Sequence, residues 1–142
     1  MRLVWALDHG LQATSKRMQF GIGVTGPQRL VLRLLGRFRG VSAGRLARLM
    51  HVHPSTLTGI LERLESRGLI VRWPDPCDAR RALLGLGAAG ERLNRERAGT
   101  VENAVRTALA SLPPHKVDAA KTVLAALIRG LGVEPAPGDG LT

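Results

Sequence analysis

Apolar residues recur at helical spacing along most of this 142-residue chain. The first such stretch, residues 3–20, predicts a helix. Its apolar positions are Leu3, Val4, Leu7, Leu11 and Met18. After the segment GIGVTG, Thr25 or Gly26 is expected to cap a second helix with Pro27 in its first turn. We expect that helix to have one apolar and one basic face, and to end at Gly40. The apolar set is Leu30, Val31, Leu34, Leu35 and Phe38, and the basic set is Arg29, Arg33 and Arg37.

Two short helices joined by a tight connection are predicted next. Ser42 is a good N-cap for a helix that continues through Met50. Pro54 suits the first turn of a helix that continues to Arg67, and Gly68 then supplies the stop. The inward positions are Leu46, Ala47 and Met50 in the third helix, and Leu57, Ile60, Leu61 and Leu64 in the fourth.

A two-stranded hairpin is predicted to follow. Residues 69–73 and 82–86 are short apolar stretches on either side of a polar tip that contains Pro, Asp and Cys. Two short helices followed directly by a basic hairpin form the plan of a winged helix-turn-helix. The expected fold class is therefore mainly α, with a two-stranded β wing.

The rest of the chain predicts two further helices and a tail. The fifth helix is expected over residues 88–111, and Pro113 and Pro114 restart the chain into a sixth. Their apolar positions are Leu93, Val101, Val105 and Leu109 in the fifth, and Val117, Ala120, Leu124, Leu127 and Leu131 in the sixth. Residues 133–142 have the Pro and Gly content of a flexible, disordered tail.

Basic charge is concentrated in the middle of the chain. The formal net charge is +10, and residues 29–81 contribute +7 of it, from eleven Arg against two Glu and two Asp. Such a stretch indicates a polyanionic partner, usually a nucleic acid. The alternative is that Arg outnumbers Lys, eighteen to three, because of genomic base composition, and that these are ordinary solvated faces.

The single cysteine, Cys77, excludes a disulfide framework and a Cys-rich metal site. A reducing cytoplasm is the expected compartment. We expect neither a signal peptide nor a membrane span, because charged residues interrupt every apolar stretch well before about 18 residues. No cofactor is expected.

The outward face of the fourth predicted helix is the expected DNA-reading surface, because a helix at this place in the plan fits the major groove. The hydroxyls of Ser55, Thr56 and Thr58 suit phosphates or base edges, and Arg63 can reach guanine or phosphate. Ser55 and Thr56 could instead only satisfy the N–H groups of the first helical turn. Ser42 and Arg45, at the start of the third helix, complete the contacts expected from the helices.

The tip of the hairpin is expected to reach the adjacent minor groove, where a negative potential favours Arg. Asp78 precedes Arg80 by two residues and Arg81 by three, so its carboxylate could hold a guanidinium by a forked hydrogen bond and aim it. The alternative is a surface ion pair that contributes little.

The sequence gives only weak signals for metal binding, thiolate chemistry or catalysis. His51 and His53 could bind a metal together with His9 or His115, but no carboxylate or Cys at ligand spacing completes the set. Cys77 is expected to be exposed beside acids, which does not favour a thiolate. No nucleophile elbow, phosphate loop or paired-carboxylate motif occurs, so neither a metal site nor an enzyme is expected.

Residues 42–90, SAGRLARLMHVHPSTLTGILERLESRGLIVRWPDPCDARRALLGLGAAG, resemble the MarR family of bacterial transcriptional regulators. The features that carry the resemblance are Leu46-Ala47, Pro54-Ser55-Thr56, Thr58, Arg63-Leu64-Glu65, Gly68-Leu69, Asp75-Pro76, Asp78, Arg80-Arg81, Leu86 and Gly90. The segment VTGPQRLVLRLL is similar to the family's second helix. The likeness extends from about residue 3 to residue 131.

The resemblance implies a homodimer in which the first, fifth and sixth helices interlock and place two winged domains on a pseudo-palindromic site in double-stranded DNA. It also implies a pocket for a small-molecule effector between the dimerisation and DNA-binding regions. Trp5 and His9, on successive turns of the first helix, are candidates to line that pocket, with dimer packing as the alternative.

Three positions depart from the family's pattern. Gly59 stands where many relatives carry a larger, often basic side chain, which predicts weak base readout there. Gly87 replaces the Thr that usually caps the fifth helix. His53 occupies the usual capping position of Ser or Asp.

We expect a single domain over residues 1–132, with dimerisation helices at 3–20 and 88–131 and a winged helix-turn-helix at 25–86. The expected function is a dimeric, sequence-specific DNA-binding transcriptional regulator, a repressor modulated by a small-molecule effector. The alternatives are a winged-helix protein-interaction module and a non-specific architectural DNA binder.

Overall fold

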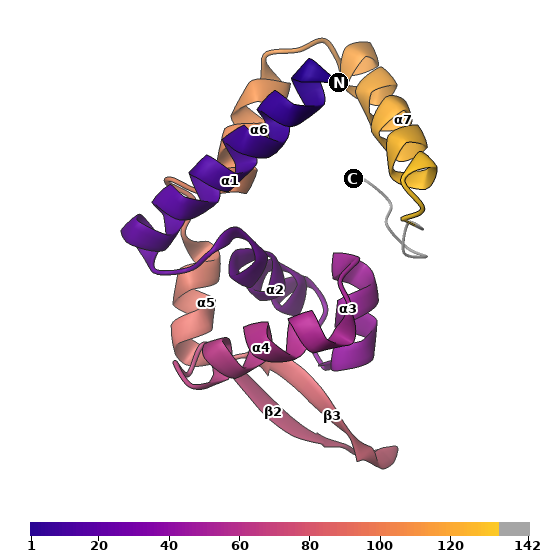
Figure 1. Cartoon of the computed structure of the whole chain (residues 1–142). Coiled ribbons are helices and arrows are strands. Elements are labelled where there is room, and N and C mark those ends of the chain that lie inside the picture. The colour runs from indigo at the N-terminus through magenta and orange to yellow at the C-terminus, as the bar shows by residue number, and fades with distance from the viewer. Residues whose placement is uncertain (134–142) are drawn as a thin grey trace.

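The computed structural model describes residues 1–133, and within them the fold is mainly helical with one small sheet (Figure 1). The helices are α1 (Arg2–Ile22), α2 (Gly26–Arg37), α3 (Ala43–Met50), α4 (Pro54–Glu65), α5 (Ala88–Arg95), α6 (Val101–Ala110) and α7 (Pro114–Gly130). The strands are β1 (Val41–Ser42), β2 (Ile70–Asp75) and β3 (Asp78–Leu86). The tail expected over residues 133–142 lies outside the described residues, apart from Val133.

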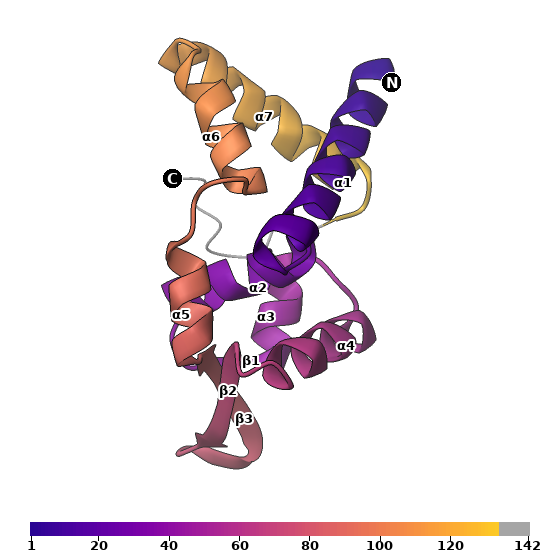
Figure 2. The same cartoon turned by 90° about the vertical axis from the view of Figure 1, so that its left-hand side faces the viewer.

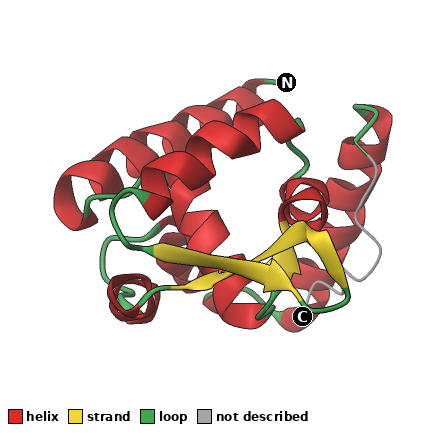
Figure 3. Ribbon diagram, turned by 90° about the horizontal axis from the view of Figure 1, so that it is seen from below, coloured by secondary structure: helices red, strands yellow, loops and turns green. Residues whose placement is uncertain are grey.

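The predicted hairpin is present, and a third strand joins it. β2 and β3 pair antiparallel from Ile70 opposite Leu86 to the tip, and the pairing shifts at Pro74 and Asp75. The two-residue strand β1 adds to the other edge of β3, so the strand order is β1-β3-β2. Figure 3 shows the strands in yellow among the red helices. The predicted two-stranded wing is therefore confirmed, and β1 is an addition that was not predicted, because a two-residue strand is too short to produce an alternating apolar pattern.

One apolar core joins α2, α3, α4 and the sheet. Its buried members are Val24, Val31, Leu32, Leu35, Val41, Leu46, Ala47, Met50, Leu57, Leu61, Leu64, Leu69, Ile70 and Leu84. The inward positions predicted for the third and fourth helices are thus confirmed, with Ile60 only partly buried.

The prediction for the second helix needs two corrections. Leu32 is fully buried, whereas Leu30 is 43% exposed, so the inward face is rotated from the expected one. Arg29, expected on the solvent face, is buried at 2% exposure. The apolar spacing was compatible with either rotation, because Leu and Val occupy five of the six positions from 30 to 35 and give no single stripe.

The fifth predicted helix is in fact two helices. α5 ends at Arg95 and α6 begins at Val101, and between them Glu96 is extended while Gly99 has a φ of +69°. The Thr100 hydroxyl caps α6 by accepting a hydrogen bond from the Asn103 backbone N–H at 3.2 Å. The apolar spacing continues across the break, so periodicity alone predicted one helix.

Local signals set most of the other helix ends. Thr25 caps α2 in a capping box with Gln28, as one of the two expected caps. α1 continues two residues beyond residue 20 and is closed by Gly23 in the left-handed conformation. α4 ends at Glu65, two residues earlier than expected, and Gly68 follows with a φ of +64°.

The helices outside the core form the opposite end of the molecule. α1 lies beside α6, and α7 extends from them. The other end is formed by residues 25–86, which contain α2, α3, α4 and the sheet and are called the winged part below (Figures 1 and 2). Neither α6 nor α7 contains a buried residue. Within residues 1–133, no helix combines the length and the hydropathy that crossing a membrane requires.

Two glycines allow α5 to pack directly against the chain that leads into β2. A Cβ on Gly87 would stand 2.5 Å from the Gly68 carbonyl oxygen, and a Cβ on Gly90 would overlap the Leu69 carbonyl oxygen. Gly87 therefore stands in place of a capping Thr because a side chain would collide with backbone. Its own N–H donates to the Leu69 carbonyl at 3.0 Å.

The variant Gly90→Ala should be destabilised, because its neighbour is backbone and cannot move aside. We expect a loss of about 3 kcal/mol in the free energy of unfolding, measured by denaturant titration. Gly59→Ala is the matched control, since nothing lies within 4 Å of its added Cβ. It should gain up to about 1 kcal/mol from helix propensity. Equal stability of the Gly90 variant and the wild type would contradict this close packing.

Candidate nucleic-acid interface

Helix α4 separates an apolar side from a polar side. Leu57, Leu61 and Leu64 are buried in the core. The residues that face outward are Ser55, Thr56, Thr58, Glu62 and Arg63, all of which are exposed. The apolar stripe therefore fixes which hydroxyls and which guanidinium the helix presents to solvent.

The histidine at the capping position of α4 acts as the cap. The Nδ1 atom of His53 accepts a hydrogen bond from the Ser55 backbone N–H at 3.3 Å and lies 2.7 Å from the Ser55 hydroxyl oxygen. The Thr58 hydroxyl donates to the Pro54 carbonyl at 3.0 Å. His53 thus replaces Ser or Asp functionally, and the first-turn N–H is satisfied by this ring rather than by Ser55 or Thr56.

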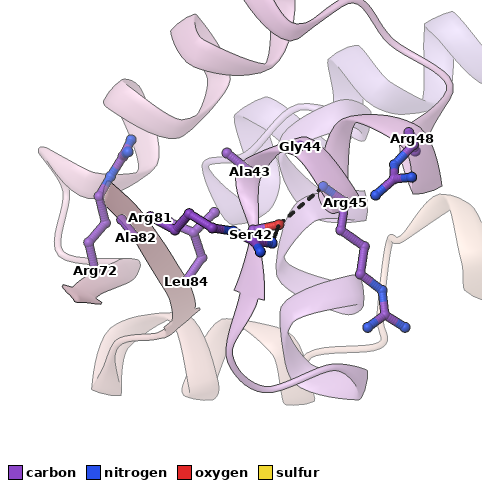
Figure 4. Close-up of a pocket in the computed structure, with 9 residues that line it drawn as sticks. All are labelled: Ser42, Ala43, Gly44, Arg45, Arg48, Arg72, Arg81, Ala82 and Leu84. Atoms are coloured by element: carbon purple, nitrogen blue, oxygen red, sulfur yellow. Dashed lines mark hydrogen bonds between the residues drawn. The ribbon is translucent and has the colours of Figure 1, made fainter. Parts of the chain in front are cut away.

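A basic groove lies between α3 and the sheet (Figure 4). It has a volume of about 490 Å³, and its lining includes four arginines: Arg45, Arg48, Arg72 and Arg81. The first two come from α3, the third from β2 and the fourth from β3. Four positive charges around one groove favour a polyanion such as a nucleic-acid backbone.

Short contacts hold parts of this groove together. The Ser42 hydroxyl caps α3 by accepting from the Arg45 backbone N–H at 3.4 Å, and it also accepts from Arg81 Nη2 at 3.4 Å. Figure 4 shows Arg81 extending toward Ser42 from the strand side of the groove. Arg72 Nε donates to Glu65 at 2.8 Å. The capping role expected of Ser42 is therefore present, and the same hydroxyl connects α3 to the wing.

An aromatic ring lies beside one arginine of the groove. The Arg45 guanidinium carbon lies 5.5 Å from the centre of the Phe38 ring, and that of Arg37 lies 5.4 Å from it. Both distances suit a cation–π interaction, which limits the motion of the long side chain. The Phe38 ring is therefore a neighbour of two arginines, one of which lines the groove.

Sequence reasoning missed Arg48 and Arg72. Arg48 follows Arg45 by three residues, so the two share a helix face, and this signal was available in the sequence. Arg72 reaches the groove because β2 pairs with β3 in a register that puts it opposite Leu84. That register depends on tertiary structure and had no local signal.

The wing tip differs from the expected arrangement. Asp78 Oδ1 accepts a hydrogen bond from the Arg80 backbone N–H at 3.0 Å, and Asp75 Oδ1 accepts from the Cys77 backbone N–H at 2.9 Å. The expectation that Asp78 holds a guanidinium is therefore corrected: its carboxylate fixes the turn. Arg80 and Arg81 instead line a second hollow of about 320 Å³ on the wing.

The predicted DNA-contacting residues thus fall into three groups. Ser42, Arg45 and Arg81 meet at the groove, and Arg80 with Asp78 lies at the wing tip. The α4 group, consisting of Ser55, Thr56, Thr58 and Arg63, is exposed on its own helix and does not line the groove.

A larger apolar hollow lies between α1, α2 and α6. Its volume is about 1270 Å³, and the lining includes Leu11, Leu30, Val105 and Leu109. Trp5 and His9, the residues predicted for an effector pocket, lie on α1 but do not line this hollow. Within the described part of the chain, no group of three or more His, Cys, Asp or Glu could hold a metal ion.

Sequence comparison identifies related proteins. The family model described as MarR family matches residues 22–81. The transcriptional regulator HosA of Escherichia coli O111:H- is 36% identical over 70 residues, which cover 49% of this chain and 52% of HosA. The chain thus aligns with about half the length of this curated relative.

Solved structures extend the similarity to most of the chain. A probable transcriptional regulator from Pseudomonas aeruginosa is 33% identical, with a TM-score of 0.69, and the match covers 89% of this chain and 96% of that one. MepR of S. aureus, crystallised in complex with DNA, has a TM-score of 0.80 at 21% identity, covering 91% of this chain and 96% of MepR. The second similarity supports the fold alone. Taken with the matched family model, these similarities establish that the chain belongs to the MarR family.

Proposed function

We propose that this protein is a dimeric, sequence-specific DNA-binding transcriptional regulator, a repressor whose binding a small-molecule effector alters. The observation that carries the proposal is that the groove of four arginines and the hydroxyl-bearing face of α4 are both mounted on one apolar core. Basic side chains neutralise phosphates, and a helix face beside them reads base edges. A chromosomal target would place the protein in the cytoplasm, and the proposal includes no catalytic role.

The proposal assigns different roles to the three groups of residues. Ser42, Arg45 and Arg81 contact phosphates, together with Arg48 and Arg72, because these residues line one basic groove. The α4 group, Ser55, Thr56, Thr58 and Arg63, enters the major groove. Arg80 reaches the minor groove from the wing tip, which Asp78 keeps in a fixed turn.

Dimerisation is supported by apolar surface that this chain leaves exposed. The side chains concerned lie on α1, α6 and α7, and they include Leu3, Val4, Leu7, Val105, Leu109, Val123, Leu124, Leu127 and Ile128. Exposed apolar surface of this extent marks an interaction site. A two-fold dimer would cover it and would place two winged parts about one helical turn of DNA apart.

Effector binding is supported by the hollow between α1, α2 and α6. It borders both the dimerisation helices and α2, so a ligand there would contact both parts of the molecule. We keep Trp5 and His9 as candidate effector contacts in the assembled dimer, with packing between the subunits as the alternative role.

A non-specific architectural DNA binder is the second candidate function. Gly59 faces open space on α4, so the helix lacks a large reading side chain at that position. Selection from random duplexes separates the two candidates. A regulator enriches one pseudo-palindromic sequence, whereas an architectural binder enriches none. Absence of duplex binding at low salt would contradict both and favour the protein-interaction module.

Replacing Arg80 by Ala should weaken binding to the selected duplex by about tenfold or more, because a guanidinium in the minor groove is lost. Titration by fluorescence anisotropy at several salt concentrations measures this change. Arg17→Ala is the matched control, since it removes the same charge from the exposed face of α1. Equal affinities of the Arg80 variant and the control would argue against a role for the wing.

Replacing Leu124 by Glu should disrupt the dimer. Leu124 is 47% exposed on α7, so the chain itself tolerates the charge, but a buried interface would leave it unpaired. Sedimentation should give twice the 15.2 kDa chain mass for the wild type and a single chain mass for the variant. Lys116→Glu is the control at an exposed polar position of the same helix. A dimeric Leu124 variant would contradict an interface at this face of α7.

A further inference from the structure

Arg29 differs from the other arginines of α2 because its side chain is buried. Arg33 and Arg37 are exposed, whereas the Arg29 side chain is 3% exposed. A buried charge is stable only where hydrogen-bond acceptors surround it. The position of Arg29 therefore indicates a dedicated set of partners.

These partners come from two other helices and from the segment that connects them. Arg29 Nε donates to Glu102 Oε1 on α6 at 2.7 Å. Nη1 donates to the Leu93 carbonyl, and Nη2 donates to the carbonyls of Glu96 at 2.5 Å and Asn94 at 3.5 Å. One guanidinium on α2 thus holds both the C-terminal end of α5 and the first turn of α6.

The segment between those two helix ends is the joint between α5 and α6. Residues 96–100 connect α5 to α6, and Figure 2 shows this connection as a turn between two separate helices. Gly99 has a φ of +69°, and the Glu96 carboxylate accepts from the backbone N–H groups of Arg97 and Ala98 at 3.0 Å each. A short glycine-containing segment of this kind can bend without breaking a helix.

Other polar contacts within residues 1–133 join α1 to the winged part. The Ser15 hydroxyl accepts from the Gly26 backbone N–H at 2.7 Å, and Arg67 Nη1 donates to the Gly23 carbonyl at 2.6 Å. Arg33 supports the Arg29 contacts, because its Nη1 donates to Asn94 Oδ1 at 3.2 Å. On the α6 side, the polar connection to α2 consists of Glu102, whose side chain is 38% exposed.

We propose that Arg29 and Glu102 form a latch across the 96–100 joint, and that this latch sets the angle between the winged part and the dimerisation helices. Arg29 is then a positioning residue that touches no DNA. Since that angle fixes the separation of two winged parts in a dimer, the latch determines the half-site spacing that the dimer accepts. The spacing consequence rests on the proposed function, whereas the angle itself does not.

The distance between the wing tip and α6 changes with this angle, and two spin labels can measure that distance within one chain. Cys77 is exposed at the wing tip and is the single native cysteine, and Thr107→Cys supplies a second label on the exposed side of α6. Diluting the doubly labelled chain in excess unlabelled Cys77→Ser protein restricts the dipolar signal to pairs within a chain. The measurement therefore works for a monomer or a dimer, with or without DNA.

The latch predicts a single narrow distance distribution for the otherwise native chain. Glu102→Gln keeps the shape and removes the ionic contact, and it should broaden the distribution at least about twofold, as should Arg29→Met. Arg97→Met is the matched control, because it removes the same charge as Arg29→Met from an exposed residue of the same joint. Should Arg29→Met fail to fold, the partly exposed Glu102 provides the test alone. Identical widths in the Glu102 variant and the control would overturn the latch.

The spacing of half-sites provides the functional readout. Inserting two base pairs between the half-sites of the selected duplex separates them by about 7 Å more and rotates them. The wild type should lose at least about tenfold in affinity on this insertion, and Glu102→Gln should lose less than about threefold. Both proteins should bind the unaltered duplex within about threefold of each other.

Two contrary results have different meanings. If the variant discriminates between spacings as sharply as the wild type, the latch does not set the spacing and the inference is overturned. If the wild type binds no duplex, the proposed function fails, and the distance distributions still decide whether the latch holds the angle.

Discussion

The burial of one apolar stripe on α4 is the constraint on which the rest of this structure depends. Leu57, Leu61 and Leu64 are covered by α2, α3 and the sheet, so the helix has a single stable rotation. Burying three such side chains contributes several kcal/mol, on the order of 1.5–3 kcal/mol each. That rotation decides which hydroxyls face outward. Because the hairpin grows from the same core, the reading face and the arginine groove are fixed relative to each other (Figure 1).

Features that depend on residues a few positions apart could be predicted from the sequence. Features that depend on contacts between distant parts of the chain could not. The inward faces of α3 and α4, the cap at Ser42 and the hairpin all follow from patterns a few residues long. The strand β1 exists only because β3 accepts it. The break at Gly99 was hidden by an apolar spacing that continues across it. Local rules therefore fixed the elements, while tertiary contacts fixed the additional strand and the joint.

The same distinction holds for the candidate site, where residues of one type have opposite roles. On α2, Arg29 is buried among carbonyls and a carboxylate, whereas Arg37 stacks on Phe38 at the surface. Composition treats both as equal contributions to a basic stretch. The packing of α5 and α6 against α2 gives Arg29 a structural role, whereas Arg37 remains at the surface, where a ligand can reach it. Likewise, the groove gains Arg72 through strand register, which no spacing in the sequence predicts.

The central claim is that the outward face of α4, the arginine groove and the wing tip act together as one surface for duplex DNA. Hydrogen-exchange mass spectrometry with the selected duplex tests it most directly, because it reports every segment of the native chain at once. The account predicts slower exchange in residues 42–48, 54–63 and 76–81 on DNA addition. Protection confined to α1, α6 or α7, with those three segments unchanged, would contradict it.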